Sequence, residues 1–172
     1  MRWYWIDRYT EFVRGKRATA VKCISMAEPH MHDHFKHFPV MPHPLVIEGV
    51  AQTGGLLICE YNNCQEKVVL AKLVKAIFYC EAVPGDVLTY HAEVQYMNEN
   101  GASITATSHI GDKLHAEFEM MFASLDHNEF GDKELFSVKD YKNLFFNFHV
   151  YEIGKEEDGV TPISIPECFK NI

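Results

Sequence analysis

The residues PLVIEGVAQTGGLLICEYN, from Pro44 to Asn62, decide the fold. Pro44 suits the first turn of a helix because its φ is already near the helical value, and the residues that follow are apolar on nearly every side. A helix that is hydrophobic all round has to be buried. Asn62 and Asn63 mark its end. The sequence therefore predicts one long central helix.

Three glycines inside this helix indicate what packs around it. In a helix interior each glycine costs about 1 kcal/mol relative to alanine. Gly49, Gly54 and Gly55 therefore indicate positions where another backbone or a ligand comes close. Packing against a sheet is the simpler of the two interpretations.

Strand-like runs lie on both sides of the helix. Two precede it, at 3–13 and 17–24, and the turn Arg14-Gly15-Lys16 joins them as a hairpin. Four more follow it between turn residues, at 68–79, 86–97, 102–110 and 113–124. We therefore expect an α+β fold in which a mostly antiparallel sheet wraps around the central helix.

The segment 27–43, between the hairpin and the helix, is predicted to be a loop. Pro29, Pro39 and Pro42 forbid a continuous helix there. Its five histidines could bind a metal through their imidazoles, but their spacing matches no familiar ligand set, so we expect no metal site. These histidines are His30, His32, His34, His37 and His43.

Composition excludes several classes of protein. The chain has 172 residues, of which 47% are apolar, enough for one substantial core. The net charge of −8 repels a phosphate backbone, so nucleic acid is not an expected partner. Five cysteines form no even, closely spaced set, which favours reduced thiols over disulfides or a zinc site.

The opening residues MRWYWIDRYTEF carry four charged side chains, which a secretory signal core does not tolerate. No run approaches the roughly 20 apolar residues of a membrane span. A cytoplasmic location without membrane contact is therefore predicted.

The composition changes after Leu125. An acidic run at 156–158 and prolines at 162 and 166 suggest a C-terminal extension over 126–172, attached to a main domain over 1–125. Several of its residues are too apolar for a solvated tail, so we expect part of it to pack on the domain or on a partner chain. These residues are Phe136, Leu144, Phe145, Phe146 and Phe148.

The candidate chemistry lies where the loop meets the helix. His34, in the loop, precedes Glu48, on the helix, by fourteen residues. A carboxylate among apolar neighbours is costly to bury unless it is protonated, paired or used. Gln52 follows Glu48 by one turn and faces the same side. An imidazole, a carboxyl group and an amide are thus candidates for one site.

The stretch from His34 to Gln52, HFKHFPVMPHPLVIEGVAQ, resembles the signature HFPGxPxMPGxLxxEAxAQ of the 3-hydroxyacyl-acyl-carrier-protein dehydratases, without a gap. Asp7-Arg8, Glu28-Pro29 and Pro84-Gly85-Asp86 resemble further elements of that family, so the similarity covers roughly residues 3–125. The chain departs from the signature where small or special residues have been replaced, at Asp33, Lys36, His37 and His43.

The resemblance implies a dimeric hotdog fold in which the histidine of one subunit faces the carboxylate of the other. It implies that His34 and Glu48 are catalytic, that the backbone N–H of His43 polarises the thioester carbonyl, and that Gln52 belongs to the site. Phe35 and Met41 are expected to contact the substrate. The expected reaction removes water from a 3-hydroxyacyl thioester, with no metal and no cofactor beyond the phosphopantetheine arm that carries the substrate.

The resemblance leaves the carrier open between an acyl carrier protein and coenzyme A. Lys72 and Lys75 are candidates for receiving an acidic carrier or the phosphopantetheine phosphate, although isolated lysines are usually solvated surface. Two other functions stay open. One is a hotdog thioesterase in which Glu48 activates water; the other is a non-catalytic acyl-binding or structural subunit, suggested by His37 and His43 in place of glycines.

Overall fold

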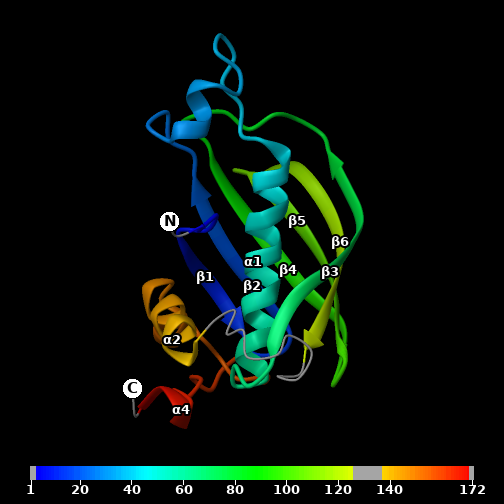
Figure 1. Ribbon diagram of the computed structural model, residues 1–172, viewed down its shortest axis with the longest axis vertical. Coiled ribbons are helices and arrows are strands. Elements are labelled where there is room, and N and C mark those ends of the chain that lie inside the picture. The colour runs from blue at the N-terminus through cyan, green and yellow to red at the C-terminus, as the bar shows by residue number, and fades with distance from the viewer. Residues whose placement is uncertain (1–2, 126–136, 171–172) are drawn as a thin grey trace.

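A computed structural model of the protein describes residues 3–125 and 137–170 (Figure 1). Six strands and a long helix make up the larger part, and short helices follow. The strands are β1 (Arg8–Val13), β2 (Arg17–Cys23), β3 (Lys67–Phe78), β4 (Val87–Asn98), β5 (Gly101–Ile110) and β6 (Lys113–Leu125). The helices are η1 (Pro29–His32), α1 (His43–Tyr61), α2 (Val138–Asn147), α3 (Val150–Ile153) and α4 (Glu167–Lys170).

The strands form one antiparallel sheet in the order β1-β2-β4-β5-β6-β3. The sheet curves around α1, which lies along its concave face (Figure 1). Val46, Val50, Leu57 and Ile58 of α1 are buried in the core beneath this helix. The α+β hotdog fold predicted from the sequence is confirmed.

Two of the helix glycines lie against the sheet. A Cβ atom at Gly49 would lie 2.7 Å from the backbone oxygen of Trp5 and 2.8 Å from the ring of Tyr90 on β4. A Cβ atom at Gly54 would overlap the side chain of Ile104 on β5. Close packing of α1 on the sheet therefore explains these two glycines.

We expect the substitution Gly49→Ala to destabilise the protein by at least about 1 kcal/mol, because the added methyl group meets a backbone atom that cannot rotate away. Urea unfolding would measure the loss. The matched control is Gly55→Ala, where the nearest atom is 3.3 Å away on the movable ring of Phe122 and where alanine favours the helix. Equal losses in the two variants would contradict the packing argument.

The element boundaries follow the sequence prediction closely, with two exceptions. The loop 27–43 contains η1, a single 3-10 turn around the buried Met31. The first predicted strand was wrong at its start, because β1 begins at Arg8 and not at residue 3. The Gln52 amide accepts a hydrogen bond from Trp5 N at 2.9 Å and donates one to Trp3 O at 2.8 Å. This segment thus pairs with a side chain of α1 and not with a strand.

The described part of the C-terminal segment packs on the outer edge of β1. Tyr9 N donates to Phe148 O at 3.1 Å, Lys155 N donates to Phe12 O at 2.8 Å, and Arg14 N donates to Lys155 O at 2.9 Å. Its apolar residues Phe145 and Phe169 are fully buried. Phe136 and the predicted start of the extension lie outside the described residues, and the domain boundary at 125 stays a prediction.

Within residues 3–125 and 137–170, no helix is long and apolar enough to cross a membrane. The cysteines at 23, 59, 64, 80 and 168 are all free thiols.

Candidate active site

The predicted site residues divide between two pockets. The loop pocket has a volume of about 320 Å³ and lies where the histidine-rich loop meets the start of α1. The helix pocket has a volume of about 660 Å³ and runs along a partly buried face of α1. The loop pocket is lined by His34, Phe35, Phe38, Val40, Met41, His43, Pro44 and Glu81.

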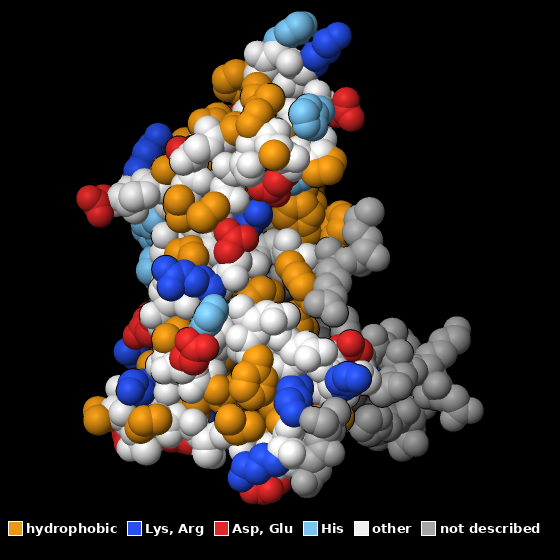
Figure 2. Space-filling view, turned by 90° about the vertical axis from the view of Figure 1, so that its left-hand side faces the viewer, with side chains coloured by type: hydrophobic (Ala, Val, Ile, Leu, Met, Phe, Trp, Pro, Cys, Tyr) orange, Lys and Arg blue, Asp and Glu red, His pale blue; other side chains and the backbone are white. Residues whose placement is uncertain are grey.

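His34 is half-buried on the loop that projects beyond the start of α1. Its backbone is fixed, because its N–H donates to His30 O at 3.2 Å and its carbonyl accepts from Val40 N at 2.8 Å. Its ring stacks on the ring of Phe35, with centroids 4.4 Å apart. Figure 2 shows the projecting end with histidine and lysine side chains at its tip and hydrophobic side chains beneath them.

The tip of this loop is apolar as well as basic. Phe35 is 58% exposed and Phe38 is 60% exposed. Met41, in contrast, is buried, and its N–H donates to Ala82 O at 2.8 Å, which ties the end of the loop to the body of the protein. The loop therefore has a fixed base and two exposed aromatic rings.

His43 is the first residue of α1, where backbone N–H groups have no partner within the helix. Its ring stacks on Phe78 with centroids 3.8 Å apart and an interplanar angle of 6°, and its Nε2 lies 3.3 Å from a carboxylate oxygen of Glu81. The side chain that replaces the glycine of the signature is thus held by Phe78 and Glu81. The helix dipole favours negative charge at this end of α1, which suits a carbonyl that gains negative charge.

A second histidine lies behind Phe78. His115 is fully buried, its Nδ1 is 2.9 Å from Ser108 Oγ, and its ring meets Phe78 edge-on. Burial, with a smaller contribution from nearby His43, lowers the pKa of His115 to about 4. His115 is therefore neutral near pH 7 and adds no positive charge beside the loop pocket.

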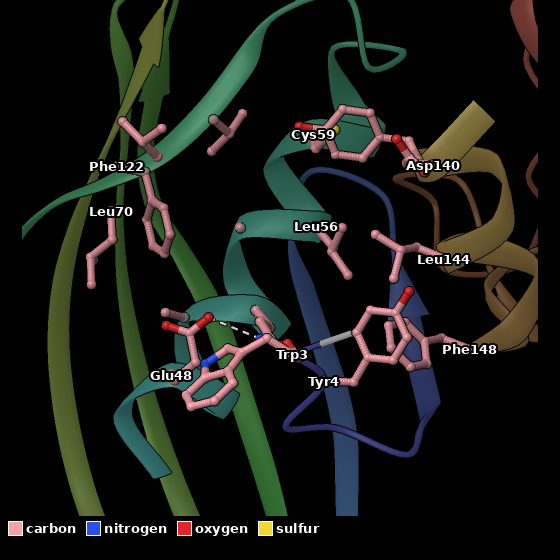
Figure 3. A pocket seen from close by; sticks show the side chains of 16 residues that line it. Trp3, Tyr4, Glu48, Leu56, Cys59, Leu70, Phe122, Asp140, Leu144 and Phe148 are labelled. Atoms are coloured by element: carbon pink, nitrogen blue, oxygen red, sulfur yellow. Dashed lines mark hydrogen bonds between the residues drawn. The ribbon is translucent and has the colours of Figure 1, made fainter. Parts of the chain in front are cut away.

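Glu48 and Gln52 line the helix pocket, not the loop pocket. Gln52 Nε2 donates to Glu48 Oε1 at 2.9 Å and to Trp3 O at 2.8 Å, while Gln52 Oε1 accepts from Trp5 N at 2.9 Å. The amide thus holds the carboxyl group in place and joins it to the N-terminal segment (Figure 3). A direct contact between Gln52 and substrate stays a prediction.

The structure thus brings His34, Phe35, Met41 and His43 together and places Glu48 and Gln52 in a separate pocket of the same chain. The resemblance assigns the histidine and the carboxyl group of one site to different subunits, and this division within one chain is compatible with that assignment. Catalysis by the pair stays a prediction.

The sequence prediction missed several residues of these pockets. Glu81 lies in the turn after β3, and no pattern pointed to it. Trp3 and Tyr4 were assigned to a strand. The C-terminal residues Tyr141, Leu144 and Phe148 recur at the three-to-four-residue spacing of a helix face, and Ser137 and Asp140 form a capping box before them. That spacing was a usable signal.

Comparison with known proteins identifies a family. Residues 3–117 match the FabA-like domain family. The 3-hydroxyacyl-[acyl-carrier-protein] dehydratase FabZ of Macrococcus caseolyticus is 35% identical over 122 residues, which cover 70% of this chain and 84% of that protein. The protein of the same name from Desulforamulus reducens is 37% identical over 119 residues, covering 69% of this chain and 84% of the relative.

Solved structures support the fold. A chain of the dehydratase heterocomplex ApeI:P from Xenorhabdus doucetiae superposes with a TM-score of 0.64 at 12% identity, covering 74% of this chain and 87% of that one. A conserved protein of Pseudomonas aeruginosa superposes with a TM-score of 0.57 at 18% identity, covering 69% of this chain and 87% of that one. The family match and the identity to the FabZ proteins together show that this chain belongs to the FabA-like family.

Proposed function

We propose that the protein is a hydro-lyase that converts a 3-hydroxyacyl thioester, carried on an acyl carrier protein, to the trans-2-enoyl thioester in fatty acid or related lipid biosynthesis. One observation carries the proposal. The stretch from His34 to Gln52 keeps the histidine, carboxyl and amide of the dehydratase signature, and the carboxyl group lines a mostly apolar pocket.

The reaction assigns a separate task to each group. His34 removes the proton on the carbon next to the thioester carbonyl, for which a neutral imidazole is suited near pH 7. Glu48 protonates the departing hydroxyl group, which leaves as water while the carbon–carbon double bond forms. The N–H of His43 donates to the thioester carbonyl as it gains negative charge.

The proposal includes a homodimer, because one chain does not bring His34 and Glu48 into the same pocket. The exposed edge of β3 supports this assembly. β3 lies at one end of the sheet, where it is paired on one side only, with β6. It exposes four large apolar side chains. A long apolar edge strand is a template for pairing with another chain. The four residues are Leu70, Leu73, Val74 and Ile77, each 38–48% exposed.

We expect Val74→Lys to shift the protein from dimer to monomer and to lower its activity in step, because a charge on the apolar edge opposes strand pairing. Sedimentation at several concentrations would measure the shift. The matched control is Val87→Lys at the start of β4, a strand with neighbours on both sides, where the side chain is 43% exposed. A Val74→Lys variant that stays dimeric would place the interface elsewhere.

A direct assay tests the function itself. The protein is incubated with 3-hydroxydecanoyl-acyl carrier protein, and the masses of the products are measured by mass spectrometry. Dehydration gives a thioester lighter by one water. Release of 3-hydroxydecanoic acid would instead show a thioesterase, and an unchanged substrate that still binds would show a non-catalytic acyl-binding subunit.

The carrier is tested by repeating the assay with the coenzyme A thioester. Lys75 is not a free cation for docking, because its Nζ lies 3.2 Å from Glu117 and 3.9 Å from Glu119 on β6. Lys72 is exposed on the same strand. We further infer a cytoplasmic location for the protein.

A further inference from the structure

The helix pocket has one wall that the family match does not include. The match to the FabA-like family ends at residue 117, whereas α2 begins at Val138. Four residues of this C-terminal part line the pocket beside the α1 residues: Asp140, Tyr141, Leu144 and Phe148. The shape of the pocket is therefore partly a property of this chain's own extension.

The pocket follows one face of α1. Glu48, Gln52, Leu56 and Cys59 line it at intervals of three or four residues, which places them on one side of the helix. Eleven residues of helix separate Glu48 from Cys59, a length of roughly 16 Å at 1.5 Å per residue. Such a length suits an extended acyl chain whose reacting end lies at Glu48.

The two sides of the pocket come from different parts of the fold. Phe122 and Leu70 of the sheet stand on one side of α1, and Leu144 and Phe148 stand on the other (Figure 3). Cys59 and Asp140 lie at the end away from Glu48 (Figure 3). An occupant that extends from Glu48 therefore passes between the sheet and α2.

α2 is held firmly enough to act as a wall. Phe145, on its inner face, is fully buried, and Phe148 contacts Tyr4 edge-on at 5.5 Å while its carbonyl accepts from Tyr9 N. The N-terminus of α2 is capped by Ser137, whose Oγ accepts a hydrogen bond from Asp140 N at 3.2 Å. These contacts fix the position of the helix relative to β1.

The polar side chains at the far end of the pocket are Tyr141 and Asp140. Burial, with smaller contributions from Cys59 and Cys64, raises the pKa of the Tyr141 hydroxyl well above its usual range. Asp140 accepts hydrogen bonds from the N–H and the hydroxyl of Ser137, so its carboxylate is engaged in the helix cap. The far end therefore presents the ring of Tyr141 and one carboxylate that is already engaged by the helix cap.

We infer that α2 is the outer wall of the acyl-binding site, and that Leu144 and Tyr141 set the length of acyl chain that the enzyme accepts. The inference rests on the proposed function, because it takes Glu48 as the reacting end of the pocket. It assigns to the C-terminal extension a role in substrate selection.

The test compares Leu144→Trp with Asn143→Trp, which adds the same bulk to α2 at an exposed position that does not line the pocket. For each protein, kcat/KM is measured with 3-hydroxybutyryl, 3-hydroxydecanoyl and 3-hydroxyhexadecanoyl thioesters. We expect Leu144→Trp to lower the ratio of decanoyl to butyryl kcat/KM at least about 10-fold, since one misfitting group in an apolar pocket has effects of this size. Asn143→Trp should keep the wild-type ratio.

A second variant and a second readout separate this inference from the proposed function. Leu144→Ala enlarges the pocket and should shift the preference toward the hexadecanoyl substrate, which tests the wall if the tryptophan variant does not fold. Binding of decanoyl-pantetheine, which cannot be dehydrated, should weaken in Leu144→Trp and not in Asn143→Trp. If the wild-type protein does not dehydrate the thioesters while decanoyl-pantetheine binding still weakens only in Leu144→Trp, the proposed function is overturned and the role of α2 stands. Equal chain-length profiles and equal decanoyl-pantetheine binding in the two tryptophan variants would overturn the role of α2.

Discussion

The variant His34→Ala is expected to lose at least about 100-fold in kcat with 3-hydroxydecanoyl-acyl carrier protein, because general base catalysis contributes a factor of this size or more. The side chain is half-buried on a loop whose backbone hydrogen bonds do not involve the imidazole, so the fold should persist. Steady-state kinetics would measure the loss, and circular dichroism would check the fold. Turnover at the wild-type rate would remove His34 from the mechanism.

The variant Glu48→Gln should show a loss of the same order for a complementary reason. The amide keeps the size of the side chain and can still hydrogen-bond Gln52, but it has no proton to give to the leaving hydroxyl. His37→Ala is the matched control for the histidine, since His37 is exposed on the same loop and does not line the loop pocket. A loss in His37→Ala equal to that in His34→Ala would point to the loop's conformation and not to one imidazole.

Mixed dimers of the two inactive variants test the site across subunits. In a hybrid, one site has both alanine and glutamine, whereas the other combines an intact His34 with an intact Glu48. Refolding an equal mixture should restore about a quarter of wild-type activity, since half of the dimers are hybrids with one working site each. If both groups instead acted within one chain, mixing would restore nothing.

The second large effect concerns stability and pH, and it comes from Glu60 near the end of α1. Its side chain is fully buried, and the guanidinium of Arg14 lies 3.3 Å away. Burial raises the pKa of Glu60 from 4.5 to about 7, although Arg14 opposes the shift. Between these two pH values the folded protein keeps a proton that the unfolded chain has released. The folded state is therefore destabilised as pH rises through this interval.

We expect the free energy of unfolding to fall by about 3 kcal/mol between pH 4.5 and pH 7 because of Glu60, at 1.36 kcal/mol for each pKa unit. Glu60→Gln should remove it, so that the variant gains stability over the wild type as pH rises. Urea unfolding at pH 5 and pH 8 would measure the difference. Arg14 keeps other partners in the variant, including Glu156 and Asn63.

Glu156→Gln is the control for this experiment. It removes the other carboxylate near Arg14, but its side chain is 32% exposed, so it should leave the pH dependence close to that of the wild type. If the free energy of unfolding of Glu60→Gln changes with pH by the same amount as that of the wild type between pH 5 and pH 8, Glu60 is ionised throughout this range.

The sequence predicted the sheet and the central helix because local patterns decide them. Strands with clear turn residues between them, such as the Pro84-Gly85-Asp86 turn before β4, were placed within one residue. The glycines of α1 predicted its packing because their cost has to be offset by a close contact. The segment before β1 was placed wrongly, since the group that pairs with its backbone is the amide of Gln52, 47 residues away from Trp5.

The candidate site was predictable only in part. The motif placed His34 on the loop and Glu48 on the helix, and the resemblance assigned the two groups of one site to different subunits, which is compatible with their lining different pockets of one chain. Glu81 enters the loop pocket through tertiary contacts that leave no trace in local periodicity. For Leu144 the helical spacing was present, but its position beside α1 depends on how the chain returns from β6.

The C-terminal segment also has a consequence for how copies of the protein can associate. Lys155 bridges to Val13, and further backbone hydrogen bonds from Phe148 and Lys155 occupy the free side of β1. This leaves β3 as the accessible border of the sheet in the described chain, so growth in the other direction is blocked. Association through β3 then gives a closed dimer. The sheet cannot extend edge to edge into an open-ended fibre.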